Sequence, residues 1–190
     1  MQHVIALSRS ALVIRHWFEI DLEDASMEHG ARVELRELAE VPRRGSESAA
    51  QVITADRPLW RADLFGRLAD QPGSFGAAHF HPEFHGNEPC DRVWSEDLTA
   101  GPWAWLHEQV ASSGAAATGK PWPIDSEDAA ELAGLAQPVV ELAQGFAAAR
   151  CTSAEQCFAL TRDARASVRL MMEYLRRPEL LDRERTALWR

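Results

Sequence analysis

Hydrophobic and polar side chains alternate along the first forty residues of the chain. Between residues 11 and 23 most even positions are apolar and several odd positions are charged; the apolar ones are Leu12, Ile14, Phe18, Ile20 and Leu22. A period of two is typical of a strand that buries one face. Residues 31–36 repeat the alternation after a short polar loop, so the pattern predicts an antiparallel pair of strands.

The extended pattern continues over residues 51–68, which predict one or two further strands. Pro58 is expected to mark an edge or a break there, because proline cannot donate to a strand ladder. Near residue 95 the pattern changes and the second half of the chain becomes helical in character. The predicted fold class is therefore α+β, with an N-terminal antiparallel sheet followed by a helical C-terminal half.

Several helix boundaries follow from single residues in the second half. Pro102 suits the first turn of a helix through residue 112, because the amide hydrogen that proline lacks has no partner there. Asp125 is a candidate cap for a helix over residues 126–150, which Pro138 is expected to kink or divide. Thr152 and Glu155 have capping-box spacing ahead of a last helix that is expected to run to about Arg177.

Length and composition are those of one folded domain. The chain has 190 residues, of which 46% are hydrophobic and 26% charged, so it can bury a substantial core without help. We expect one domain over residues 1–190, made of a β-rich part, 1–95, and a helical part, 96–190.

The charge and cysteine content exclude several classes of protein. The net charge of −9 is opposite in sign to a phosphate-binding surface, so nucleic acid is not an expected partner. No apolar run approaches the ~18 residues of a membrane span, and no membrane partner is expected. Three cysteines without CxxC spacing favour a reducing compartment over a disulfide framework. These features predict a soluble cytoplasmic protein.

The chemistry that the sequence offers is concentrated in AAHFHPEFHG, residues 77–86, which holds three of the seven histidines. If this segment is extended, its polar side chains share one face and its apolar ones the other. The polar set is His79, His81, Glu83 and His85. Alternate residues of a strand lie ~6.6 Å apart, so two imidazoles on one face can converge on a single ion.

A metal centre is the sharper interpretation of this segment. Neutral imidazole suits divalent transition metals such as Zn, Fe, Ni or Cu, which makes His79, His81 and His85 the candidate ligands. Glu83 and Glu88 are candidate carboxylates that complete the site or move a proton as catalytic residues. Cys90, Asp91 and His16 are further candidates; His16 lies on the otherwise apolar face of the first predicted strand.

A plainer interpretation uses the same residues. An exposed edge strand interrupted by Pro82 would show the same alternation, with histidine as an ordinary polar residue. A metal-free acid/base or substrate-binding site is a third alternative. All three interpretations stay open at the level of the sequence.

The pair "HFH" after a strand-rich N-terminus resembles the first metal motif of the cupins, in which HxH is followed by a glutamate and a later strand supplies another histidine. Gly73 precedes His79 by the interval usual in that motif. The positions expected for the glutamate hold His85 and Gly86, and the only later histidine is His107, in a predicted helix. Two of the four ligand positions differ, so we do not assign the chain to this family.

Other catalytic motifs do not compete with the histidine segment. Residues 114–121, GAAATGKP, have the glycine and lysine spacing of a phosphate-binding loop. Pro121, however, stands where such a loop has the serine or threonine that binds magnesium. The function that the sequence favours is a small metal-dependent enzyme acting on a small molecule through a divalent transition metal. The alternative is a noncatalytic binding or interaction protein. For this alternative the helical half is a candidate homodimer interface, so a homo-oligomer is a candidate assembly.

Overall fold

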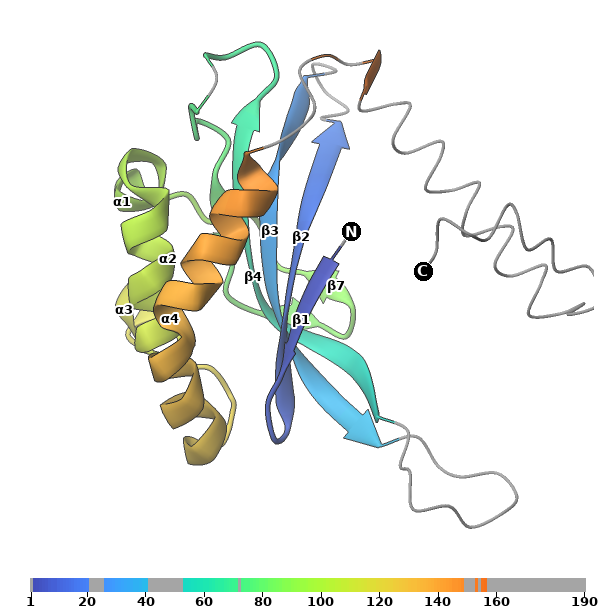
Figure 1. Ribbon diagram of the computed structural model, residues 1–190, viewed down its shortest axis with the longest axis vertical. Coiled ribbons are helices and arrows are strands. Elements are labelled where there is room, and N and C mark those ends of the chain that lie inside the picture. Colours follow the sequence, from blue (N-terminus) through green and yellow to red (C-terminus); the bar gives the residue numbers. More distant parts are fainter. Residues whose placement is uncertain are drawn as a thin grey trace, which may run out of the picture. The chain divides into compact units, whose positions relative to one another are not determined.

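The computed structural model describes residues 2–20, 26–40, 53–71, 73–148, 153 and 155–156 (Figure 1). Five strands form one sheet: β1 (Gln2–Ala6), β2 (Ser10–Ile20), β3 (Met27–Glu40), β4 (Ile53–Arg67) and β5 (His79–His81). Two short strands form a separate hairpin: β6 (Phe84–His85) and β7 (Glu88–Pro89). The helices follow: α1 (Glu96–Ala100), α2 (Pro102–Ala111), α3 (Ala115–Thr118) and α4 (Ser126–Ala147).

The predicted fold class is confirmed. The five-stranded sheet has the order β1-β2-β3-β4-β5, every neighbouring pair is antiparallel, and the helices of the described residues all come after it in the chain. The predicted pairing of the first two alternating segments is that of β2 with β3. Residues 53–67 form one long strand, β4, whose register with β3 shifts where Pro58 lies opposite Arg36.

Three helix predictions can be compared with the structure. Pro102 is the first residue of α2, as predicted. Asp125 caps α4, because its side chain accepts a hydrogen bond from the backbone N–H of Asp128. Pro138 lies inside α4 and does not divide it, so that part of the prediction was wrong. Residues on both sides of Pro138, such as Leu132 and Val140, are buried, and this packing outweighs the ~3 kcal/mol that an internal proline costs. Thr152 and the predicted last helix lie outside the described residues.

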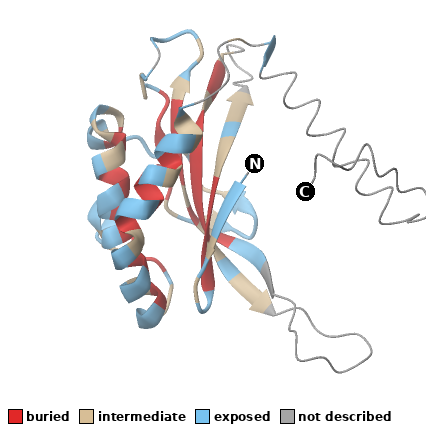
Figure 2. Ribbon diagram, in the orientation of Figure 1, coloured by how far each residue is buried: buried red, intermediate tan, exposed pale blue. Residues whose placement is uncertain are grey.

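One face of the sheet packs against the helices and forms the apolar core. Figure 1 shows α2 and α4 on the same side of the sheet, and Figure 2 shows buried residues on the strands and on the helical turns facing them. The even positions of β2, including Leu12 and Ile14, meet the odd positions of β3, including Val33 and Leu35. The helices add Trp105, Leu106, Val110, Leu132, Val139 and Val140 to this core.

The opposite face of the same strands is charged. The register of the sheet places Arg32 beside Asp63, Asp63 beside His79, and Arg61 beside His81. Nine ion-paired side chains gather on this face, and we call them the charged layer: Arg15, Glu19, Glu28, Arg32, Glu34, Arg36, Arg61, Asp63 and Arg92. The candidate site lies within this layer.

The chain divides into two compact units, residues 1–150 and 151–190. The strands and helices given above all belong to the first unit. The expectation of one domain over the whole chain stays a prediction, because most of the second unit lies outside the described residues. Among the helices that the structure describes, none is both long and apolar enough to cross a membrane.

Candidate metal centre

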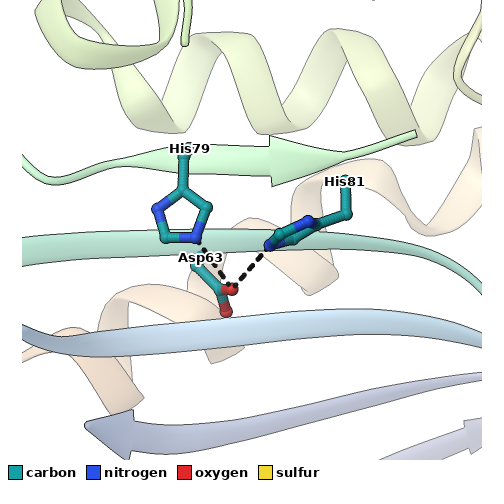
Figure 3. A group of neighbouring side chains, drawn as sticks. All are labelled: Asp63, His79 and His81. Carbon is teal, nitrogen blue, oxygen red and sulfur yellow. Dashed lines mark ion pairs between the residues drawn. The ribbon is translucent and has the colours of Figure 1, made fainter. Parts of the chain in front are cut away.

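Two neighbouring strands bring one carboxylate and two imidazoles together. Asp63 projects from β4, and His79 and His81 project from β5, which pairs with it. Oδ2 of Asp63 lies 3.4 Å from Nε2 of His79 and 3.8 Å from Nε2 of His81. Figure 3 shows both rings directed at the same carboxylate. His79 and Asp63 are fully buried and His81 is 4% exposed, so the interpretation of these histidines as surface residues does not hold.

The backbone decides which nitrogen of each ring carries the hydrogen. Nδ1 of His79 lies 2.9 Å from the carbonyl oxygen of Ala77, and Nδ1 of His81 lies 2.6 Å from that of Cys90. A carbonyl oxygen can only accept, so Nδ1 must donate in both rings. In the neutral imidazole Nε2 then holds a lone pair. Histidines that bind a metal through one ring nitrogen usually donate a hydrogen bond from the other nitrogen, often to a carbonyl oxygen as here.

In the neutral form of the two rings, both Nε2 lone pairs face a carboxylate oxygen. Neither Nε2 atom has a hydrogen-bond partner among the described residues, although both are buried. The distances of 3.4 and 3.8 Å exceed those of an N–H···O hydrogen bond, which are about 2.7–3.2 Å. Electron-rich atoms facing one another in a buried place repel unless a cation lies between them.

The arginines keep the carboxylate ionised. Arg32 donates one hydrogen bond to each oxygen of Asp63, with N···O distances of 2.5 and 3.0 Å. Burial by itself would raise the pKa of Asp63, but the guanidinium groups of Arg32 and Arg61 hold it well below its ordinary value. Asp63 is therefore a carboxylate across the physiological pH range, as a metal ligand must be.

His81 is neutral under the same conditions. Burial lowers its pKa to about 4. The hydrogen bond to the carbonyl oxygen of Cys90 and the negative charge of Asp63 each raise this pKa, but by less than burial lowers it. A proton on His81 is thus a poor way to neutralise the facing carboxylate at neutral pH. A metal ion has no such requirement, because it binds imidazole in the neutral form.

The spacing of the three ligand atoms suits one ion. All three lie within 4.8 Å of one another. With bonds of about 2.1 Å to nitrogen and oxygen, the ligand atoms around a tetrahedral ion lie about 3.4 Å apart. The two distances from Asp63 Oδ2 are close to this value, so small side-chain movements would complete the coordination.

Aromatic rings surround the three residues. The ring of Trp94 lies 5.3 Å from that of His79, and Phe65 meets His79 edge-on at 6.1 Å. Phe84 lies 6.4 Å from His81. These neighbours lower the local dielectric, which strengthens electrostatic interactions within the site.

The remaining residues predicted from the sequence lie elsewhere. The extended segment ends at His81, and His85 belongs to the separate β6–β7 hairpin. Pro82 has no N–H with which to continue the ladder beside β4. His85, Glu83 and Glu88 are all exposed and do not join the buried group, so their assignment as ligand and catalytic residues stays a prediction.

The secondary candidates contribute less. Cys90 supplies its carbonyl oxygen to His81, and Asp91 is exposed. His16 lies on the helix-facing side of β2, opposite Ala31, and so on the other face of the sheet from Asp63.

Asp63 is the candidate ligand that sequence reasoning missed. It lies in a stretch of alternating character, where Trp60, Ala62 and Leu64 are apolar and Arg61 and Asp63 are polar. That alternation marks Asp63 as a member of the polar face. Its pairing with His79 depends on the register of β4 with β5 across an intervening loop, which no local pattern specifies.

Comparison of the chain with family models, with curated proteins and with solved structures finds no match. Its chemistry must therefore be argued from its own residues.

Proposed function

We propose that the protein binds one divalent transition metal ion through Asp63, His79 and His81, and that it is a small metal-dependent enzyme. The observation that carries this proposal is a pair of buried Nε2 atoms that lie near one oxygen of Asp63 and have no hydrogen-bond partner among the described residues. A cation removes the repulsion, and three ligands of this kind are a common protein set for Zn²⁺ or Fe²⁺.

The chemistry follows from the number of ligands. Three protein ligands would leave at least one coordination position open, and a bound ion would polarise a substrate oxygen or lower the pKa of a water molecule there. The protein's own contribution is to fix the rings through the carbonyl oxygens of Ala77 and Cys90, and to keep Asp63 ionised through Arg32. The proposed substrate of the enzyme is a small molecule.

The first experiment measures metal content. Purified protein, incubated separately with Zn, Fe, Mn, Ni and Cu salts and then desalted, is analysed by mass spectrometry for bound metal. We expect about one equivalent of at least one metal in the unsubstituted protein. The His79→Gln/His81→Gln double variant should lose it, because two of three ligands are gone, and circular dichroism checks that the variant is folded.

The matched control is His85→Gln, which removes a nearby exposed histidine. It should bind metal as the unsubstituted protein does. Substoichiometric metal under all conditions, or equal losses in His85→Gln and the double variant, contradicts the proposal. The first of these outcomes would favour the alternative of a noncatalytic binding or interaction protein.

A further inference from the structure

The five arginines of the charged layer are unevenly partnered. Arg32 is held by Asp63 and Glu19, and Arg92 donates to both Glu19 and Glu28 at 2.9 Å. The buried Nε atoms of Arg61 and Arg15, in contrast, have no hydrogen-bond partner among the described residues.

Arg61 competes for the oxygen that the metal proposal uses. Its Nε lies 3.1 Å from Oδ2 of Asp63, the same atom that faces His79 and His81. The approach forms an ion pair without hydrogen-bond geometry. When an ion draws electron density from Oδ2, the attraction that holds Arg61 there weakens, and its guanidinium is left needing another acceptor.

The balance of charge points the same way. Five guanidinium groups of the charged layer face four carboxylates, an excess of one positive charge before any metal is present. A divalent cation adds two more. Positive charge concentrated in a largely buried place is costly unless an anion neutralises it.

The edges of the layer are suited to a ligand that is partly apolar. Trp94, beside the His79 ring, is 49% exposed, and Trp17, which lies under the guanidinium groups of Arg15 and Arg32, is 37% exposed. Exposed tryptophans next to converging polar groups are typical of small-molecule sites. The side chains of Arg61 and Arg15 are 12% and 26% exposed, whereas that of Asp63 is fully buried. An anion from solvent can therefore contact the two arginines.

We propose that the ligand of this site is an anionic small molecule, a carboxylate or phosphate carried on an apolar group, whose negative oxygens are bound by Arg61 with support from Arg15. This inference rests on the metal site proposed above. The metal would contact the same ligand, and Trp94 would pack against its apolar part.

The experiment uses three simple probes on the full chain. Benzoate and phenyl phosphate represent the two anions, and benzamide is the neutral match of benzoate. Binding to metal-loaded protein is followed by isothermal titration calorimetry, after metal content has been measured in every sample. We expect benzoate or phenyl phosphate to bind at least ~10-fold more tightly than benzamide, since a charge-assisted hydrogen bond is worth at least that factor.

Substitutions then identify the arginine. Arg61→Gln should weaken binding of the preferred anion at least ~10-fold, and Arg61→Lys, which keeps the charge, should recover part of it. Arg57→Gln is the matched control, because Arg57 lies on the same strand but pairs with Glu37 at an exposed position. It should bind the anion as the unsubstituted protein does.

The outcomes separate the two proposals. Failure of the unsubstituted protein to load metal overturns the metal site and this inference with it. Normal metal loading with benzamide binding as tightly as both anions overturns this inference alone, as does equal anion affinity in Arg61→Gln and Arg57→Gln. Should Arg61→Gln fail to fold, the contrast between anions and benzamide, together with Arg61→Lys, still decides.

Discussion

At the scale of single residues, one oxygen of Asp63 determines the character of the site. Its Oδ2 lies between 3.0 and 3.8 Å from four nitrogen atoms, which belong to Arg32, Arg61, His79 and His81. Of these four nitrogens only those of the arginines can donate to Oδ2, because Nε2 of a neutral histidine whose Nδ1 donates carries no hydrogen. A metal ion between Oδ2 and the two Nε2 atoms would remove the repulsion among them.

A second pair of histidines lies on the other face of the sheet. The rings of His16 on β2 and His29 on β3 are 5.9 Å apart, and each has a buried nitrogen without a hydrogen-bond partner among the described residues. Burial lowers the pKa of both side chains below 6.5, and for His16 the neighbouring His29 adds to the effect. The folded protein therefore favours the neutral form of both.

This pair predicts a loss of stability in mild acid. The two histidines take up protons in the unfolded chain at pH values where they stay neutral in the folded chain. Their contribution to the free energy of unfolding is therefore complete above pH 6.5 and decreases as the pH falls below this value. The slope is at most about 1.4 kcal/mol per pH unit for each histidine. Urea unfolding at pH 7.5 and pH 5.5 measures the difference, which should be smaller in a His16→Gln/His29→Gln variant.

Comparison with a third histidine isolates the cause. His85 is exposed, so His85→Gln should leave the pH dependence as it is in the unsubstituted protein. An unchanged pH dependence in the His16→Gln/His29→Gln variant would show that these two rings are not responsible.

At the scale of elements, the start of α4 is fixed to the sheet by one carboxylate. Asp128 is fully buried and accepts hydrogen bonds from the backbone N–H groups of Ser8 and Arg9 and from the hydroxyl of Ser10, at 2.8, 3.1 and 2.7 Å. This contact ties the helix to the turn between β1 and β2. It thereby helps to keep α4 on the apolar face of the sheet, with the charged layer on the other.

We expect Asp128→Ala to lower the free energy of unfolding by about 3 kcal/mol, because three donors lose their shared acceptor in a partly buried place. Chemical denaturation measures this loss. Glu127→Ala removes an exposed carboxylate from the same helical turn and should cost less than about 1 kcal/mol, the usual contribution of a charge near a helix N-terminus. Equal costs for the two substitutions would rule out the proposed role of Asp128.

The short strand β5 shows how the elements position the candidate ligands. It has three residues, but it is held on both sides: β4 pairs with it, and Phe80 exchanges two backbone hydrogen bonds with Val93, at 3.0 and 2.9 Å. The Phe80 side chain packs against Trp105 of α2 at 5.1 Å. Because Phe80 points into the core, His79 and His81 must point to the opposite face.

At the scale of the whole molecule, a metal at the centre should stabilise the fold. An ion that binds the folded chain more tightly than the unfolded one adds about 2.7 kcal/mol at a concentration 100 times its Kd. We expect the metal identified by mass spectrometry to raise the Tm of the unsubstituted protein in thermal denaturation by several degrees. The His79→Gln/His81→Gln variant should show no increase, and an equal increase in both proteins would mean that the metal acts elsewhere.

The sequence by itself determined the class of fold and two of the three residues of the candidate centre. Period-two alternation in residues 11–23 and 31–36 predicted β2 and β3 because one face of each strand must be buried. It also put His79 and His81 on a common face, since this follows from their spacing alone. Strand β1 was not predicted: its residues are mostly exposed and alternate weakly.

Only the tertiary structure decided which residue completes the candidate centre. Glu83, His85 and Glu88 are near the histidines in sequence but leave the strand after Pro82, whereas Asp63 lies sixteen positions before His79 and meets it through strand pairing. The local pattern fixes the face of a strand on which a side chain lies. Which side chain lies beside it depends on the register between strands, and the register is set by packing of the whole sheet against its helices.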